Sequence, residues 1–307
     1  MAGSLLSFPL ANSLLDDFEL MNSTFLAQGY LFFRDVLDRD AVLRAKQDIV
    51  RVLQDQGIAR RGETEPLWTG SGVERIDDNP LYALDSCRNL LQLKTTCQFV
   101  EKIFGAPVFM YQNTDIRFSL PNDQRHLTPP HQDHFFIRQT DRFRTVWIPL
   151  MDIDPQMGGL ALAPGSHLHG LLAHEESETV YSYIFRGRKQ RGVSSVSGSG
   201  DWLTIHYRPG DLLIFHSLMV HRALPNTSDR IRLSLDARYQ PRSDPRTWQS
   251  ERTIPELRKY RQEVQKIAFA EGLSEEQFES VLIEMMKRGL NAEAQNVRDL
   301  LETSRFT

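Results

Sequence analysis

The N-terminal third of the chain contains both helical and extended patterns of apolar residues. Residues 39–56 place apolar side chains at helical spacing, and Gly57 follows as a stop signal. Directly before them, residues 29–37 are rich in aromatic and aliphatic side chains, which predicts a strand. A second helix is predicted over 89–104, ending at Gly105.

From about residue 107 the pattern changes to short apolar runs separated by Pro, Gly, Asn and Asp, which is typical of an all-β sandwich or barrel. Residues 184–202 are polar and rich in Gly and Ser, and they predict a mobile surface loop. After residue 250 the pattern is helical again, and Ser274 with Gln277 forms a capping box. We therefore expect a mainly β fold with flanking helices.

This layout predicts a single domain over residues 1–307, with a helical N-terminal part (1–106), a β core (107–241) and a helical C-terminal extension (242–307). The composition, with 40% hydrophobic residues, is sufficient for a sizeable core. The net charge of −4 argues against nucleic acid and anionic membranes as partners. Two cysteines and an opening segment without a cationic region favour a cytoplasmic protein. We expect a monomer or a homodimer.

Candidate chemistry centres on the sequence PPHQDHFF at 129–136. On a strand, residues two apart point to the same face, so His131 and Asp133 would converge while His134 faces away. An imidazole nitrogen and a carboxylate oxygen at this spacing supply two corners of a metal site. Alone, such a pair is more often a simple hydrogen-bonded pair, so the assignment depends on a third ligand.

His221 is the best candidate for that ligand, because a strand with one wholly polar face follows it. Positions 230–238 alternate between polar residues and Ile, Leu or Ala. On that face Arg232 and Ser234 are suited to hold a carboxylate, although a solvent-facing strand surface is the alternative. Two histidines and one carboxylate, with open positions opposite, form the facial triad of non-haem Fe(II) oxygenases.

Four ordered segments make the chain resemble the phytanoyl-CoA dioxygenase family of Fe(II)/2-oxoglutarate oxygenases. They are FLAQGYLFFRDVL near the start, PHQD at 130–133, WIPLMDIDPQMGGLALAPGSH at 147–167 and GDLLIFHSLMVHRALPNTSDRIRLSLDARYQ at 210–240. The resemblance extends over residues 25–241 in the right order. It implies a double-stranded β-helix, a jelly-roll barrel with helices packed outside.

The resemblance also implies roles for individual residues. His131, Asp133 and His221 look like the iron ligands. Arg232 looks like the anchor for the distal carboxylate of 2-oxoglutarate, with Ser234 as its helper. Related halogenases replace the carboxylate ligand with a small residue, so the presence of Asp133 argues against halogenation.

Three further positions bear on the co-substrate pocket. Trp147 matches an aromatic residue that borders this pocket in relatives, with plain core packing as an equal alternative. Gln112 is a weaker match to a residue that contacts the co-substrate. Ala223 departs from the family pattern, because many relatives have a hydrogen-bonding group there.

The implied cofactor is Fe(II), with 2-oxoglutarate and O2 as co-substrates. 2-Oxoglutarate would chelate the iron through its C1 carboxylate and C2 ketone. The expected reaction is hydroxylation of an unactivated C–H bond of a small organic metabolite, with release of succinate and CO2. The alternatives are desaturation, epoxidation or cyclisation by the same cofactor chemistry, or a non-catalytic jelly-roll protein that binds the metal or 2-oxoglutarate.

Candidate substrate contacts lie in two places. His134, Phe135 and Phe136 follow the predicted metal ligands and are candidates to line the substrate cavity, with ordinary burial as the alternative. Arg186 and Arg188 are candidates to bind an anionic group of the substrate, with a solvated loop as the alternative.

Overall fold

The structure is a computed structural model, and it describes residues 5–70, 76–137, 140, 142–181, 188–195 and 201–304. The chain forms two compact units. The first comprises Met1–Met110 and Asp115–Ser243, and the second comprises Tyr111–Thr114 and Asp244–Thr307. The second unit contains nearly all of the expected C-terminal extension. That the whole chain acts as one oxygenase domain stays a prediction.

The first unit is built on two larger sheets and a hairpin. One sheet has the strand order β2-β10-β5-β12-β3, with β4 also paired to β12, and the other has the order β1-β9-β6-β11. The hairpin pairs β7 with β8. Among the described strands every pairing is antiparallel except that of β1 with β9. The strands are β1 Leu5–Ser7, β2 Tyr30–Phe33, β3 Val108–Met110, β4 Asp115–Ser119, β5 Arg144–Pro149, β6 Leu160–Leu162, β7 Glu175–Val180, β8 Lys189–Gly192, β9 Trp202–Thr204, β10 Leu212–His216, β11 His221–Ala223 and β12 Arg232–Pro241.

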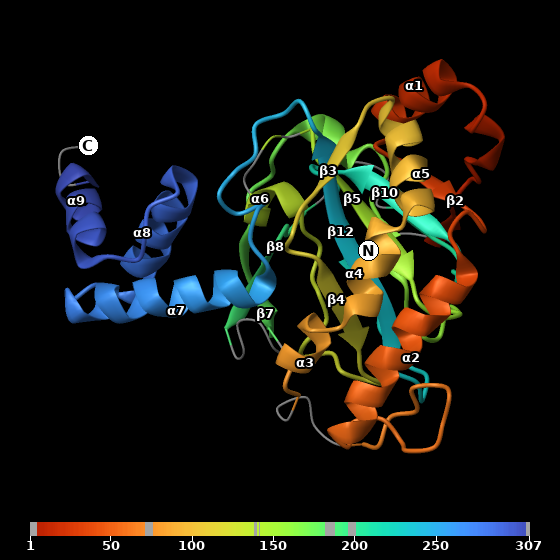
Figure 1. Cartoon of the computed structure of the whole chain (residues 1–307), viewed down its shortest axis with the longest axis horizontal. Helices are drawn as coiled ribbons and strands as arrows, with labels where there is room; N and C mark the ends of the chain where they lie inside the picture. Colours follow the sequence, from red (N-terminus) through yellow and green to blue (C-terminus); the bar gives the residue numbers. More distant parts are fainter. Residues whose placement is uncertain are drawn as a thin grey trace. The chain divides into compact units, whose positions relative to one another are not determined.

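Helices flank the strands of this unit (Figure 1). Helix α1 contacts β2, α5 contacts β3, and α2 packs on α4. Their apolar faces join the inner faces of both larger sheets in one buried core. This arrangement is the expected jelly-roll class. The helices of the unit are α1 Phe18–Gln28, α2 Arg39–Asp55, α3 Asn79–Tyr82, α4 Asp85–Gln92, α5 Lys94–Phe104 and α6 Asp133–Ile137, with 3-10 helices η1 Asn12–Leu14 and η3 Ser166–His169.

The N-terminal part contributes more to the sheets than expected. Strand β2 is fully buried and pairs with β10, and β1 forms an edge of the smaller sheet. The single helix expected over 89–104 is two helices, because Leu93 takes an extended conformation between α4 and α5. Gly105 ends α5 with a positive φ of 64°, which agrees with the stop signal in the sequence.

The prediction of a mobile loop over 184–202 was wrong for the part of this segment that the structure describes. Residues Lys189–Gly192 form β8, with alternating exposed and buried side chains. Within this strand the buried Gln190 donates to the carbonyl oxygens of Leu127 and Val180. Trp202, at the other end of the segment, starts β9. Pairing with β7 therefore forms a strand in a sequence with few apolar residues, and the buried Gln190 is hydrogen-bonded through its amide group.

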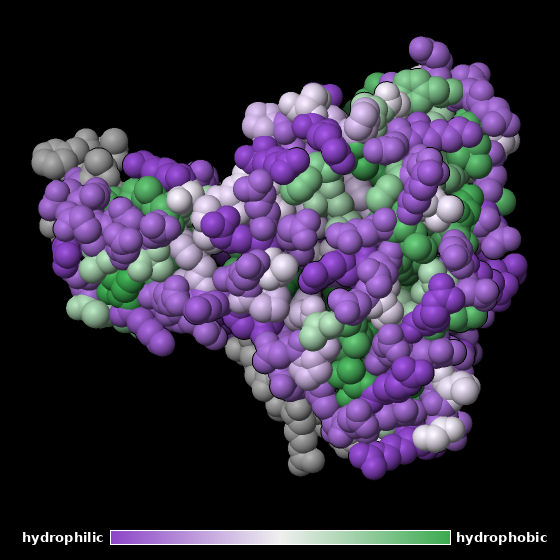
Figure 2. Space-filling model, in the orientation of Figure 1, coloured by the Kyte–Doolittle hydropathy of each residue, from purple (hydrophilic) through white to green (hydrophobic). Residues whose placement is uncertain are grey.

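In the part of the second unit that the structure describes, three helices surround a separate apolar core. The predicted capping box of Ser274 and Gln277 is present, and Gly289 ends the helix in the left-handed region. No helix in the described ranges combines the length and the apolar composition that crossing a bilayer requires. On the face shown in Figure 2, hydrophilic residues predominate, and the hydrophobic ones occur in separate groups. The helices are α7 Ile254–Ala270, α8 Glu275–Arg288 and α9 Ala294–Ser304.

Candidate metal centre

The structure brings His131, Asp133 and His221 together from distant parts of the chain. His131 and His221 form an isolated antiparallel bridge, in which each backbone N–H donates to the carbonyl oxygen of the other at 2.9 and 3.0 Å. Asp133 is the first residue of α6. All three residues are buried, and one donor atom from each lies within 4.8 Å of the others.

The expectation that His131 and Asp133 share one strand face was wrong. The chain leaves the bridge after His131 and begins a helix at Asp133. The intervening Gln132 is fully buried and donates through its side chain to the carbonyl oxygens of Gly170 and Leu218. These bonds hold the backbone where it turns from the bridge into the helix. His131 and Asp133 therefore converge because of this turn and not because they share one face of a strand.

Both histidines have a defined tautomer. His131 Nδ1 lies 2.9 Å from the carbonyl oxygen of Pro129, and His221 Nδ1 lies 3.0 Å from that of Met219. A carbonyl oxygen only accepts, so each Nδ1 carries the hydrogen and each Nε2 keeps its lone pair. Each Nε2 lies 3.6 Å from Asp133 Oδ1. The three donor atoms therefore face one another, as a metal site requires.

The electrostatics favour the ligating protonation states. Burial by itself raises the pKa of Asp133, but Arg238 and the two histidines outweigh burial and hold this pKa well below its usual value. Burial, together with the nearby His131, lowers the pKa of His221 to about 3. At neutral pH the carboxylate is charged and His221 is neutral, and these are the forms that bind a metal.

Two residues that the sequence did not indicate contact Asp133. The hydroxyl of Thr145 donates to Asp133 Oδ2 at 2.6 Å. Arg238 donates to the same oxygen from Nε and Nη2, at 3.3 and 3.2 Å. Arg238 belongs to the alternating polar run of β12, so the sequence pattern placed its side chain on the same face as Arg232 and Ser234. No pattern in the sequence indicated Thr145.

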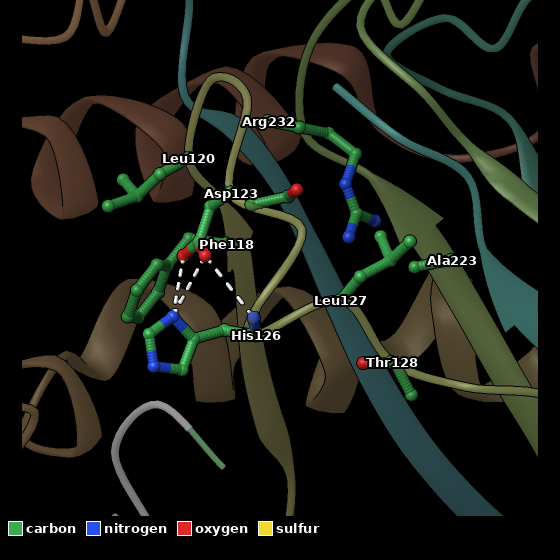
Figure 3. A pocket seen from close by; sticks show the side chains of 9 residues that line it. Phe118, Leu120, Asp123, His126, Leu127, Thr128, Ala223 and Arg232 are labelled. Atoms are coloured by element: carbon green, nitrogen blue, oxygen red, sulfur yellow. Dashed lines mark hydrogen bonds and ion pairs between the residues drawn. The ribbon is translucent and has the colours of Figure 1, made fainter. Parts of the chain in front are cut away.

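Arg232 and Ser234 lie inside the barrel, so the solvent-facing alternative was wrong. Arg232 is 5% exposed and Ser234 is fully buried. Arg232 Nη1 donates to Ser234 Oγ at 3.2 Å. Arg232 lines a small cavity together with Thr128 and Ala223, among others. Figure 3 shows its guanidinium pointing toward Leu127 and Ala223.

The other two residues expected at the co-substrate have different surroundings. Trp147 is 2% exposed and packs edge-on against Tyr207, with ring centroids 4.7 Å apart. Gln112 belongs to the second unit, where its backbone N–H donates to the carbonyl oxygen of Ser250. For both residues the co-substrate role stays a prediction.

The candidate substrate residues lie around α6 where the structure describes them. Phe136 is 39% exposed and packs edge-on against His131, at 5.6 Å between ring centroids. Phe135 stacks on His174 at 4.1 Å, and the ring of His134 lies parallel to that of Phe143 at 6.3 Å. Arg188 lies directly before β8, and its carbonyl oxygen accepts from the backbone N–H of Tyr181. Arg186 falls outside the described residues.

The donor set fits ferrous iron. Two neutral imidazoles and one carboxylate are the ligands of the 2-His-1-carboxylate sites of non-haem Fe(II) oxygenases. The carboxylate supplies a negative charge, and the carbonyl groups behind the imidazoles fix their orientation. Nothing in the donor set favours zinc in a structural site, because such sites use four protein ligands rich in cysteine.

Comparison with known proteins agrees with this chemistry. The family model for phytanoyl-CoA dioxygenase (PhyH) matches residues 25–234. The 1-deoxypentalenic acid 11-beta-hydroxylase of Streptomyces arenae is 34% identical over 255 residues, covering 80% of this chain and 89% of that protein. Its counterpart in Streptomyces exfoliatus is 32% identical over 269 residues, covering 84% and 94%.

Among solved structures, the chain is similar to the non-heme alpha ketoglutarate dependent epimerase SnoN from nogalamycin biosynthesis. The TM-score is 0.50 at 24% identity, and the match covers 74% of this chain and 83% of that chain. At this identity the likeness supports the fold. Together with the family match and the two hydroxylase relatives, it confirms the expectation drawn from the ordered motifs. The chain belongs to the phytanoyl-CoA dioxygenase family of Fe(II)- and 2-oxoglutarate-dependent oxygenases.

Proposed function

We propose that the protein hydroxylates an unactivated C–H bond of a small organic metabolite, with iron held by His131, Asp133 and His221. The observation that carries this proposal is the buried cluster of two Nε2 lone pairs and one carboxylate oxygen. When bound, the iron supplies oxygen activation coupled to conversion of 2-oxoglutarate into succinate and CO2. The protein's own groups bind and orient the reactants and keep the three donor atoms facing one another.

In this proposal Arg232 holds the distal carboxylate of 2-oxoglutarate. Its guanidinium is buried and lines the cavity, so its charge is poorly screened and attracts a carboxylate strongly. Ser234 orients that guanidinium through the hydrogen bond to Nη1. Trp147, which belongs to the same unit as Arg232, completes the proposed set of co-substrate residues.

The substrate is proposed to approach beside α6. Phe136 is partly exposed next to the candidate ligand His131, and Phe135 lies directly before it. Such aromatic surfaces favour a substrate with a hydrocarbon skeleton. The names of the Streptomyces relatives specify hydroxylation of 1-deoxypentalenic acid. We therefore propose a free small metabolite of this kind for the present chain. Its cytoplasmic location and monomeric or homodimeric state stay predictions.

An anaerobic titration tests the cofactor site first. Purified metal-free protein receives Fe(II) and then 2-oxoglutarate, and the visible charge-transfer band of the chelate is recorded. The band is expected in the wild type and is expected to be lost in His221→Gln. His206→Gln is the matched control, because His206 is a half-exposed histidine whose Nε2 lies 3.7 Å from Asp152 Oδ1. A wild type that binds neither iron nor 2-oxoglutarate contradicts the proposal.

A second experiment determines the reaction outcome. Candidate metabolites are incubated aerobically with the iron-loaded protein, and succinate and product masses are measured. Hydroxylation adds one oxygen atom, whereas desaturation or cyclisation removes two hydrogens. If no succinate forms with or without any candidate, while binding of 2-oxoglutarate is intact, the non-catalytic alternative is favoured.

A further inference from the structure

We propose that Thr145 and Arg238 are positioning residues that make Asp133 a one-oxygen ligand, by occupying Oδ2 and leaving Oδ1 to the metal. The inference rests on the proposed function, since it takes His131, Asp133 and His221 as the metal site. It assigns a purpose to two buried residues that bind no metal themselves and that the expected ligand and co-substrate sets do not include.

The two carboxylate oxygens of Asp133 have different surroundings. Oδ2 accepts from the Thr145 hydroxyl at 2.6 Å and from two nitrogens of Arg238 at 3.2 and 3.3 Å. Oδ1 instead faces the two Nε2 atoms of His131 and His221, 3.6 Å from each. The plane of the carboxylate is therefore fixed by protein donors on one side, and only the other oxygen faces the candidate metal position.

Sheet register explains why these two residues act on one oxygen. Thr145 on β5 lies directly opposite Arg238 on β12 in the antiparallel ladder. Residues paired in this way point to the same face of the sheet, so both side chains enter the barrel side by side. Thr145 is 1% exposed and Arg238 is 5% exposed, so both interactions are shielded from water.

Two further carboxylates lie near the guanidinium of Arg238. Asp115 Oδ2 lies 3.9 Å from Arg238 Nη1, and Asp236 Oδ2 lies 3.8 Å from Nη2. The hydroxyl of Tyr82 donates to the other oxygen of Asp115 at 3.0 Å. These carboxylates attract the guanidinium independently of any metal, so they help to hold Arg238 close to Asp133.

The one-oxygen mode matters for the reaction. A facial triad leaves open positions on one side of the metal, and 2-oxoglutarate and O2 need all of them. If Asp133 bound through both oxygens, it would take one of these positions. Donors on Oδ2 prevent this, so loss of a donor should weaken the binding of iron and also the chelation of 2-oxoglutarate to the loaded site. Outer-shell partners of metal ligands typically contribute about 10- to 100-fold in metal affinity.

Thr145→Val tests the inference, because it removes the hydroxyl and keeps the size and shape of the side chain. Thr145→Ser, which retains the donor, is the rescue variant. Thr204→Val is the matched control, because the Thr204 hydroxyl donates to the Leu160 carbonyl oxygen in the other sheet. Arg238→Gln is added as a second variant that removes donors to Asp133 Oδ2. Anaerobic Fe(II) affinity, 2-oxoglutarate affinity of the loaded protein and the melting temperature are measured for each.

We expect Thr145→Val to weaken Fe(II) binding about tenfold or more and to weaken the 2-oxoglutarate chelate as well. The Fe(II) and 2-oxoglutarate affinities of Thr145→Ser and Thr204→Val should stay within about twofold of the wild-type values. Arg238→Gln should lose at least as much affinity as Thr145→Val. If the wild type binds iron and folded Thr145→Val binds both iron and 2-oxoglutarate equally well, the inference is overturned while the proposed function stands. A wild type without iron binding overturns both. Should Arg238→Gln fail to fold, the Thr145 variants still decide the question.

Discussion

Replacing Arg232 by Gln should selectively weaken the binding of 2-oxoglutarate. The guanidinium is 5% exposed and lines the cavity, so solvent and salt screen its interaction with a carboxylate only weakly. A hydrogen bond to a charged group contributes about 1.5–3 kcal/mol, which corresponds to a roughly 10- to 150-fold increase in Kd. Arg232→Lys keeps the charge but loses the planar fork, and we expect an intermediate loss.

The assay is a titration of iron-loaded protein with 2-oxoglutarate in the absence of oxygen, followed by the chelate band. Arg230→Gln is the control, because Arg230 lies two residues earlier on the same face of the run and pairs with Asp154 at 2.9 Å, where its side chain is 28% exposed. The control should change Kd less than about twofold, as partly exposed ion pairs contribute little. Equal 2-oxoglutarate affinities for Arg232→Gln and Arg230→Gln, with iron binding intact in both, would refute the assignment of Arg232.

Three further predictions concern pH, metal and the C-terminal unit. In metal-free protein, His221 of the unfolded chain takes up a proton near pH 6.5, whereas His221 in the folded protein stays unprotonated down to about pH 3. The free energy of unfolding therefore falls with acidification over that window. Denaturant unfolding should show a loss of about 2 kcal/mol at pH 5 relative to pH 7, and His221→Gln should flatten this dependence. Removal of the metal by a chelator should lower the melting temperature. Addition of Fe(II) at about 100 times its Kd should raise the free energy of unfolding by about 2.7 kcal/mol, except in His131→Gln. Ser274→Ala should lower the stability of α8 by about 1 kcal/mol by removing the cap on Gln277, which helix content measured by circular dichroism during denaturation will reveal.

The buried polar face of β12 contacts two different parts of the proposed site from its two ends. Arg232 lines the cavity proposed for 2-oxoglutarate and donates to Ser234, whereas Arg238 donates to the candidate ligand Asp133. All ten residues of the strand are buried, so each charged side chain on it needs a buried partner.

The sequence alone was sufficient where neighbouring residues decide the structure. Alternation over 230–238 predicted a strand with one polar face, and β12 has it. Ser274 with Gln277 predicted a helix start, which is where α8 begins. These features depend on side-chain periodicity and on local hydrogen bonds, both of which are encoded within a few residues.

Predictions from local sequence patterns were wrong where contacts with distant segments decide the conformation. The strand expected at His131 and Asp133 becomes a bridge followed by a helix, because Gln132 bonds to carbonyl groups far along the sequence. The break at Leu93 likewise has no local signal.

Only the tertiary structure identified how the candidate ligand Asp133 is held. Thr145 lies 12 positions from it and Arg238 lies 105 positions from it, and the pairing of β5 with β12 brings both to one oxygen. No sequence period connects these positions, since their proximity depends on which strands pair and in which register. Register is set by the burial of whole sheet faces and not by any single residue. The sequence thus determined which groups carry the expected chemistry, and the tertiary structure decided which groups orient them.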